Sequence, residues 1–123
     1  MSEVWVCEAD ELSPGEVRTA HLGHDEGGLP IMALVLRDPG GVLRAYRNLC
    51  RHLPVPLDGG TGQLFTDDGK HLLCGTHGAT YRLTDGYCTE GPCEGLSLHR
   101  LPCREAADGI YVAPPTAPSR GRL

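Results

Sequence analysis

Glycine and proline interrupt this sequence so often that a long helix has little room to form. The 123 residues include 17 glycines and 10 prolines, spread along the chain. Inside a helix, glycine costs about 1 kcal/mol and proline about 3 kcal/mol relative to alanine. No stretch of ten or more residues places apolar side chains at the helical spacing. The sequence therefore predicts a small all-β protein with antiparallel strands.

Short runs in which apolar and polar residues alternate mark the expected strands. A strand is expected to start at Val17, and residues 13–16 before it are interpreted as a turn rather than as a helix cap. Residues 38–41 and 67–69 have the Asp, Pro and Gly composition of hairpin turns. The other expected strands cover residues 3–7, 31–37, 42–47, 63–66, 70–74, 78–83, 97–101 and 110–113.

Composition and charge exclude several classes of function. The net charge of −5 argues against nucleic-acid binding, which requires clustered basic residues. The longest apolar run, residues 31–36, is much shorter than the roughly 20 residues of a membrane helix. No signal peptide is evident, so we expect a soluble, cytoplasmic protein. Residues 1–113 are expected to form one domain, and residues 114–123, rich in Pro, Ser and Arg, a flexible tail.

Two short motifs each combine one cysteine with one histidine. Cys50 and His52 are separated by one residue, and Cys74 and His77 by two. Each motif follows a predicted strand and begins a loop. Two thiolates and two imidazoles can bind zinc in a tetrahedron, or a [2Fe–2S] cluster with the thiolates on one iron and the imidazoles on the other. Zinc sites usually group Cys with Cys and His with His, whereas these motifs would give each iron one ligand from each loop. The order therefore favours the cluster and leaves zinc as an alternative.

The remaining four cysteines, Cys7, Cys88, Cys93 and Cys103, are interpreted as small apolar core residues. Cys88 and Cys93 are close enough in sequence to pair. The expected cytoplasmic location argues against a disulfide between them.

The pattern C-x-H followed by C-x-x-H resembles the Rieske iron–sulfur family, and Cys50, His52, Cys74 and His77 match it position by position. The 21 residues between His52 and Cys74 are a few more than is common, and the excess falls near the turn at 67–69. The resemblance implies an antiparallel β-sandwich of the Rieske type, with a cluster-binding subdomain of two loops at about residues 48–93. It also implies one [2Fe–2S] cluster per chain, held by these four residues.

Two further features indicate a branch of that family. High-potential Rieske proteins have a disulfide between the two loops, and Val55 and Thr76 stand at the matching positions. Ala79 replaces a serine that donates a hydrogen bond to a bridging sulfide in those proteins. Fewer donors to the sulfurs imply a lower reduction potential. Tyr81 is the partial exception, because its hydroxyl could donate to a cysteine sulfur.

The resemblance implies an electron-transfer protein and not an enzyme by itself: a Rieske-type ferredoxin that carries one electron from a reductase to an oxygenase or another acceptor. An electron-transfer subunit of a larger oxidoreductase is the first alternative, and a zinc-stabilised binding module is the second. The iron domain of a ring-hydroxylating oxygenase would not fit in the remaining length. The partners of this protein are expected to be redox proteins, and neither nucleic acid nor a membrane is expected among them. Arg47 and Arg51 flank the first motif and are interpreted as solvated charges, with docking to an acidic redox partner as the alternative.

Overall fold

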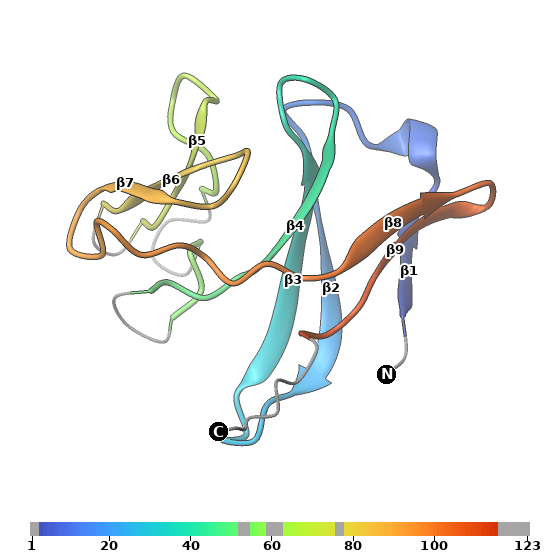
Figure 1. Ribbon diagram of the computed structural model, residues 1–123, viewed down its shortest axis with the longest axis horizontal. Helices are drawn as coiled ribbons and strands as arrows, with labels where there is room; N and C mark the ends of the chain where they lie inside the picture. Colours follow the sequence, from blue (N-terminus) through green and yellow to red (C-terminus); the bar gives the residue numbers. More distant parts are fainter. Residues whose placement is uncertain (1–2, 52–54, 59–62, 76–77, 116–123) are drawn as a thin grey trace.

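The computed structural model describes residues 3–51, 55–58, 63–75 and 78–115, and this part of the chain consists almost entirely of β structure (Figure 1). Its strands form three antiparallel sheets of three strands each, ordered β1-β9-β8, β2-β3-β4 and β5-β6-β7. The helical content of the described part is one short 3-10 helix, η1. In chain order the elements are β1 (Val4–Cys7), η1 (Ala9–Glu11), β2 (Val17–His24), β3 (Pro30–Arg37), β4 (Leu43–Arg47), β5 (His71–Leu73), β6 (Thr80–Arg82), β7 (Cys88–Glu90), β8 (Cys103–Ala106) and β9 (Gly109–Val112).

The first two sheets pack face to face as a sandwich, which confirms the predicted fold class. Antiparallel pairing joins β2 to β3 and β3 to β4, and on the opposite side β9 lies between β1 and β8 (Figure 1). Apolar side chains from both sheets and from two adjoining loops fill the space between the sheets. They are Cys7, Leu12, Ala33, Val35, Ala45, Leu101, Ile110 and Val112.

Strand β3 is buried on both faces because it separates two cores. Ala33 and Val35 face the sandwich core, whereas Leu34 and Leu36 belong to a second core. Successive side chains of a strand point to opposite faces, so an uninterrupted apolar run is expected only where both faces are covered. The apolar run at residues 31–36 thus belongs to the strand that contributes side chains to both cores.

Most of the second core lies in a small lobe, residues 48–98, which contains β5, β6 and β7 and stands beside the sandwich (Figure 1). The buried hydroxyl of Tyr46 on β4 donates to the carbonyl of Leu83 in this lobe at 2.8 Å. The two ends of the lobe meet: the amide of Arg47 donates to the carbonyl of His99 at 2.8 Å, and Tyr46 forms a β-bridge with Arg100. The lobe is therefore one continuous insertion between β4 and β8.

The predicted turns are present. The amide of Glu16 donates to the carbonyl of Ser13, which confirms a turn at 13–16, and residues 38–41 close a hairpin between β3 and β4.

Among the described residues, no helix qualifies as a membrane span, and η1 has three residues.

Several predicted strands are wrong in detail. Residues 63–66 and 97–101 were expected to be strands, but they form only isolated bridges, such as Phe65 with Leu72 and Tyr87 with Ser97. Conversely, β7 and β8 were not predicted, because these segments of three and four residues are too short and too polar to show alternation. Their strand conformation depends on pairing with β6 and β9.

Candidate metal centre

The two motif cysteines lie at the start of two loops and are both buried. Cys74 directly follows β5, and Cys50 follows β4 by three residues. Only 3% of Cys50 and none of Cys74 is exposed, and both belong to the core of the small lobe. The described residues therefore place two sulfur atoms within one apolar core, as the motif predicts for the thiolate half of the site.

Backbone hydrogen bonds fix the shape of each loop and join the two. The amide of Cys50 donates to the carbonyl of Val55 and that of Cys74 to the carbonyl of Ala79, both at 2.8 Å. The amide of Gly75 donates to the carbonyl of Leu57 at 2.9 Å, which ties the second loop to the continuation of the first. The loops are thus held together without a disulfide. His52 and His77, the other two predicted ligands, lie outside the described residues, as does Thr76.

Asn48 anchors the first loop at its start. Its backbone amide donates to the carbonyl of Met32 on β3, and its side-chain oxygen accepts from the amide of Leu57, both at 2.7 Å. Its side-chain nitrogen donates to Asp58 at 3.2 Å. The backbone of Asn48 therefore fixes the start of the loop to the sandwich, and its side chain holds the continuation of the loop at residues 57 and 58. The sequence signal for this role is an asparagine just ahead of a Pro- and Gly-rich loop.

The hydroxyl of Tyr81 reaches the first cysteine, as predicted. It lies 3.6 Å from Sγ of Cys50 and accepts a hydrogen bond from the backbone amide of Arg51 at 3.2 Å. Burial raises the pKa of Tyr81 far above its ordinary value. The hydroxyl therefore keeps its proton and can donate it in a hydrogen bond to a sulfur. Ala79, fully buried, has no hydroxyl to offer.

The turn after β7 covers the segment that follows the second motif. Gly91 has φ +104°, and a Cβ there would lie 2.6 Å from Cα of Ala79. Only glycine allows the two backbones to approach so closely. The turn brings Cys93 against Tyr81, with Sγ 2.8 Å from the hydroxyl oxygen, a contact that the sequence did not indicate.

Burial agrees with the core interpretation of the other cysteines. Cys7, Cys88 and Cys93 are buried, and Cys103 is half-buried against the sandwich core. Cys88 and Cys93 are free thiols.

The interpretation of the flanking arginines as solvated charges is wrong for Arg47. This residue is only 9% exposed, and its guanidinium donates to Asp25 at 2.9 Å and to the carbonyl of Pro30 at 3.3 Å. Arg51 is half-buried and donates to the carbonyl of Ser97. Both side chains hold the backbone near the first motif in place through hydrogen bonds, and the sequence could not show their partners.

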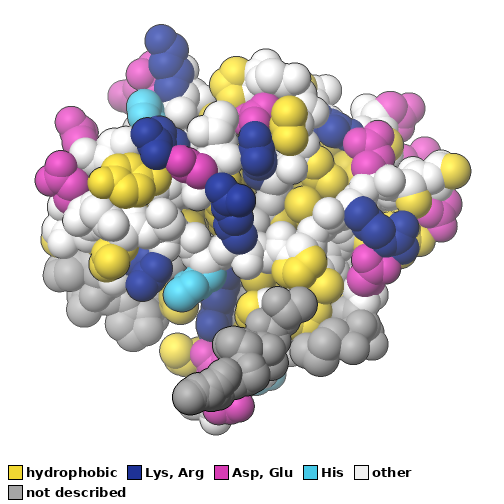
Figure 2. Space-filling view, in the orientation of Figure 1, with side chains coloured by type: hydrophobic (Ala, Val, Ile, Leu, Met, Phe, Trp, Pro, Cys, Tyr) yellow, Lys and Arg dark blue, Asp and Glu magenta, His cyan; other side chains and the backbone are white. Residues whose placement is uncertain are grey.

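Basic and acidic side chains are interspersed over the face shown in Figure 2.

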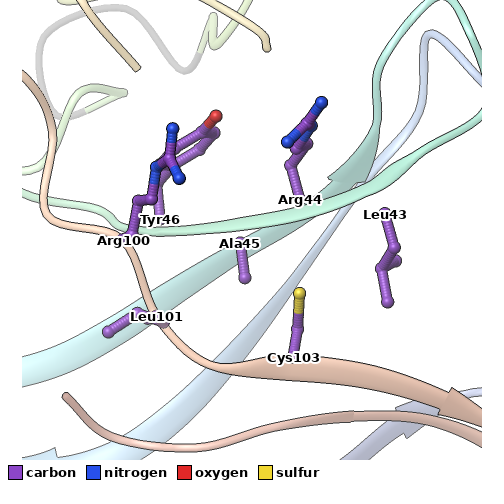
Figure 3. Close-up of a pocket in the computed structure, with 7 residues that line it drawn as sticks. All are labelled: Leu43, Arg44, Ala45, Tyr46, Arg100, Leu101 and Cys103. Carbon is purple, nitrogen blue, oxygen red and sulfur yellow. The ribbon is translucent and has the colours of Figure 1, made fainter. Parts of the chain in front are cut away.

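A surface groove of about 220 Å³ lies between β4 and β8, apart from the two motif cysteines (Figure 3). Its basic groups are Arg44, which is held by Asp38 at 3.0 Å, and Arg100. The sulfur of Cys103 points toward β4 in this groove (Figure 3). The lining residues include neither Cys50 nor Cys74, so the groove does not belong to the candidate centre.

Comparison with known proteins agrees with this geometry. Residues 2–103 match the family model described as the Rieske [2Fe-2S] domain. The chain is similar to the ferredoxin of carbazole 1,9a-dioxygenase from Nocardioides aromaticivorans IC177, with 27% identity, a TM-score of 0.65, and coverage of 93% of this chain and 99% of that one.

Two longer proteins are similar over part of their length. The terminal oxygenase of the carbazole dioxygenase from the same organism shares the fold, with 22% identity, a TM-score of 0.65, and coverage of 98% of this chain and 33% of that chain. Chlorophyllide a oxygenase from Arabidopsis thaliana is 33% identical over 108 residues, which are 81% of this chain. The chain spans only 19% of that relative's length.

Proposed function

We propose that this chain, which belongs to the Rieske [2Fe-2S] domain family, is a one-electron carrier that receives an electron from a reductase and passes it to an oxygenase or a similar acceptor. A family match across residues 2–103 implies one [2Fe–2S] cluster per chain. The observation that carries the proposal is the burial of Cys50 and Cys74 in one core, on two loops tied by the hydrogen bond from Gly75 to Leu57.

The proposed ligands are Cys50 and Cys74 for one iron and His52 and His77 for the other. The described residues fit such a group on the cysteine side, because both sulfurs are buried and Tyr81 is placed to donate to Cys50. When bound, the cluster accepts and releases one electron, and neutral imidazoles in place of two thiolates raise its potential above that of all-cysteine clusters.

The protein sets the potential through the groups around the sulfurs. Reduction adds a negative charge to the site, and hydrogen bonds donated to the sulfurs stabilise that charge. Tyr81 supplies such a donor, whereas the buried methyl group of Ala79 supplies none. We therefore place the potential below that of Rieske proteins that have both donors.

Ligation can be tested by metal analysis and electron paramagnetic resonance of the dithionite-reduced protein. We expect about two irons and two sulfides per chain and the low average g value of mixed Cys/His ligation. Replacing any of the four proposed ligands by alanine should abolish this signal, whereas the control Cys103→Ser, at a half-buried position in β8 against the sandwich core, should keep it. An average g value typical of all-cysteine ferredoxins would contradict histidine ligation, and a colourless zinc protein would contradict the cluster.

Histidine ligation also predicts a pH-dependent potential. The added negative charge of the reduced state favours protonated imidazole, so reduction raises the pKa values of His52 and His77. The potential should then fall as the pH rises through the alkaline range. Voltammetry from neutral to strongly alkaline pH measures this, and a flat profile would count against it.

Carrier function is supported by the likeness to a ferredoxin over 99% of that chain. A direct test mixes the holoprotein with the reductase and the terminal oxygenase of a carbazole 1,9a-dioxygenase system. The reductase should reduce the cluster, and the oxygenase with its substrate and oxygen should reoxidise it. A cluster that exchanges electrons with neither protein would argue against this role. The expected cytoplasmic location is part of the proposal and can be tested by cell fractionation.

A second candidate is the electron-transfer domain or subunit of a larger oxidoreductase. The observation that favours it is the 33% identity to chlorophyllide a oxygenase, of which this chain spans a small part. Affinity purification from native cells distinguishes the two candidates. A stable catalytic partner that co-purifies in fixed stoichiometry would favour the second candidate, and a carrier that purifies alone would favour the first.

A further inference from the structure

A second pair of sulfur atoms lies in the core of the small lobe, next to Tyr81. Sγ of Cys88 is 3.4 Å from Sγ of Cys93, and the two residues are 0% and 2% exposed. A disulfide requires about 2.05 Å, so the two sulfurs would have to approach by roughly 1.3 Å. A rotation of the side chains supplies a movement of this size.

The backbone holds the two cysteines opposite each other. Cys88 lies in β7, and its amide donates to the carbonyl of Leu96 at 2.8 Å. The amide of Leu96 in turn donates to the carbonyl of Cys93 at 3.0 Å. The turn that contains Cys93 therefore folds back over Cys88. Pro92 and Glu94, on either side of Cys93, are exposed, so this turn lies at the surface although the side chain of Cys93 is buried.

Hydrogen bonds connect this pair to the candidate centre. The hydroxyl of Tyr81 lies between Sγ of Cys93 at 2.8 Å and Sγ of Cys50 at 3.6 Å. The thiol of Cys88 donates at 3.2 Å to the carbonyl of Glu90. A continuous row of polarisable groups thus runs from Cys88 through Cys93 and Tyr81 to Cys50.

We propose that Cys88 and Cys93 form a second redox site, a dithiol that hydrogen peroxide oxidises to a disulfide, and that its oxidation weakens the hydrogen bond from Tyr81 to Cys50. One sulfur takes an oxygen atom from the peroxide, which breaks the O–O bond, forms a sulfenic acid and releases water. The second sulfur displaces that oxygen as another water when the S–S bond forms. The two thiols lose two electrons and two protons, and the peroxide is reduced to two waters.

The effect on Cys50 follows from the number of protons available. Tyr81 has one hydroxyl proton, and an iron-bound thiolate at Cys50 accepts it better than a neutral thiol does. Cys93 then donates its own proton to the oxygen of Tyr81, which strengthens the bond to Cys50 through polarisation. A disulfide sulfur has no proton to donate. This second part rests on the proposed function, because it requires Cys50 to be a cluster ligand, whereas the dithiol chemistry does not.

Peptide mapping tests the dithiol directly. Trypsin cleavage after Arg82 and Arg100 releases residues 83–100, which contain Cys88 and Cys93 and no other cysteine. The holoprotein is treated with peroxide at doses that preserve its visible spectrum, unfolded in N-ethylmaleimide and digested. We expect this peptide to carry no N-ethylmaleimide and to be about 2 Da lighter than the peptide with two free thiols. If dithiothreitol reduces the protein before alkylation, the peptide should carry two N-ethylmaleimide adducts. Two N-ethylmaleimide adducts on this peptide after peroxide treatment without dithiothreitol would overturn the proposal.

The midpoint potential tests the connection to Cys50. In the wild-type holoprotein, peroxide should lower the potential and dithiothreitol should restore it. Cys93→Ser keeps a donor but cannot form the disulfide, so its potential should stay near that of the wild type and not respond to peroxide. Cys93→Ala should have the lowered potential permanently. The matched control, Cys103→Ser, should behave like the wild type.

The two parts of the proposal can fail separately. A disulfide that forms without any change of potential would overturn the connection to Cys50 and leave the dithiol in place. If the cluster shows all-cysteine ligation, the proposed function fails, while the peptide result stands independently. Because the peroxide and dithiothreitol cycle uses the wild-type chain, the test does not depend on the folding of any variant.

Discussion

At the scale of single residues, the hydroxyl of Tyr81 is a polar group placed to donate to Cys50. Tyr81→Phe removes this hydroxyl and leaves the ring, so we expect a lower midpoint potential. A hydrogen bond worth about 1 kcal/mol more in the reduced state corresponds to roughly 40 mV for one electron. Voltammetry of the holoprotein measures this shift.

Tyr111→Phe is the matched control for that substitution. It removes a hydroxyl that donates to Asp108 at 2.7 Å on the surface of the sandwich. Its potential should equal that of the wild type. Equal potentials for Tyr81→Phe and the wild type would show that the hydroxyl does not interact with the cluster sulfur.

How far the site could be predicted depends on the kind of residue. The placement of Cys50 and Cys74 in one core was predictable, because the motif requires particular residue types at particular spacings, and those are visible in the sequence. The contacts of Cys93 with Tyr81, and of Arg47 with Asp25, were not predictable. They join residues whose separation along the chain has no pattern, and they exist only after the strands have paired.

At the scale of elements, the turn after β7 depends on a close backbone contact. A Cβ at Gly91 would lie 2.6 Å from Cα of Ala79, and φ is +104°. Strain in the left-handed region and overpacking against backbone together suggest a cost of about 2–4 kcal/mol for Gly91→Ala. We expect a clear loss of thermal stability, measured by circular dichroism.

Gly95→Ala serves as the control in the same turn. Gly95 has φ +94°, but a Cβ there would meet nothing within 4 Å. It should therefore show only the conformational cost of about 1–2 kcal/mol. If both variants melt at the same temperature, the close approach to Ala79 is not a source of stability.

The ion pair between Asp25 and Arg47 ties the β2–β3 hairpin to the end of β4. The hydrogen bond from Arg47 lowers the pKa of Asp25, and backbone amides of Leu29 and Gly27 add to this effect. A lowered pKa in the folded state stabilises the fold above the unfolded pKa of about 3.9, and this contribution is lost as the pH falls through the folded value. Asp25→Asn should thus lower the melting temperature at pH 7, with the difference shrinking below about pH 4.

The neighbouring Glu26→Gln provides the control, because Glu26 is exposed and lies beside Asp25. Its melting temperature should follow the wild type across the same pH range. A constant difference between Asp25→Asn and the wild type down to pH 2 would contradict the role of the ionised carboxylate.

The predictability of the elements follows from their burial. Strand β3 was predicted nearly to its ends because six consecutive apolar residues are required where both faces are covered. Strands β7 and β8 escaped prediction because their conformation depends on the neighbouring strand rather than on their own residues. Local composition determines the first kind of strand and tertiary pairing the second.

At the scale of the whole molecule, two cores of different character share β3. The sandwich core joins strands of four to eight residues, whereas the small lobe has three strands of three residues around the motif loops. Removal of the cluster by a chelator should therefore loosen the lobe far more than the sandwich. We expect amide hydrogen exchange in β5, β6 and β7 to accelerate by about tenfold or more, with little change in β2 and β3. Equal acceleration in both parts would indicate a single cooperative unit.

The meeting of the two ends of the small lobe has a practical consequence for protein engineering. Because the amide of Arg47 bonds to the carbonyl of His99, and Tyr46 bridges to Arg100, the stretch between them can be exchanged as a cassette at one pair of splice sites. A transplanted lobe would bring its own reduction potential, while the residues of the sandwich would stay the same. The residues such an exchange must match are Leu34, Leu36 and Tyr46, because these side chains of the scaffold pack in the same core as the lobe.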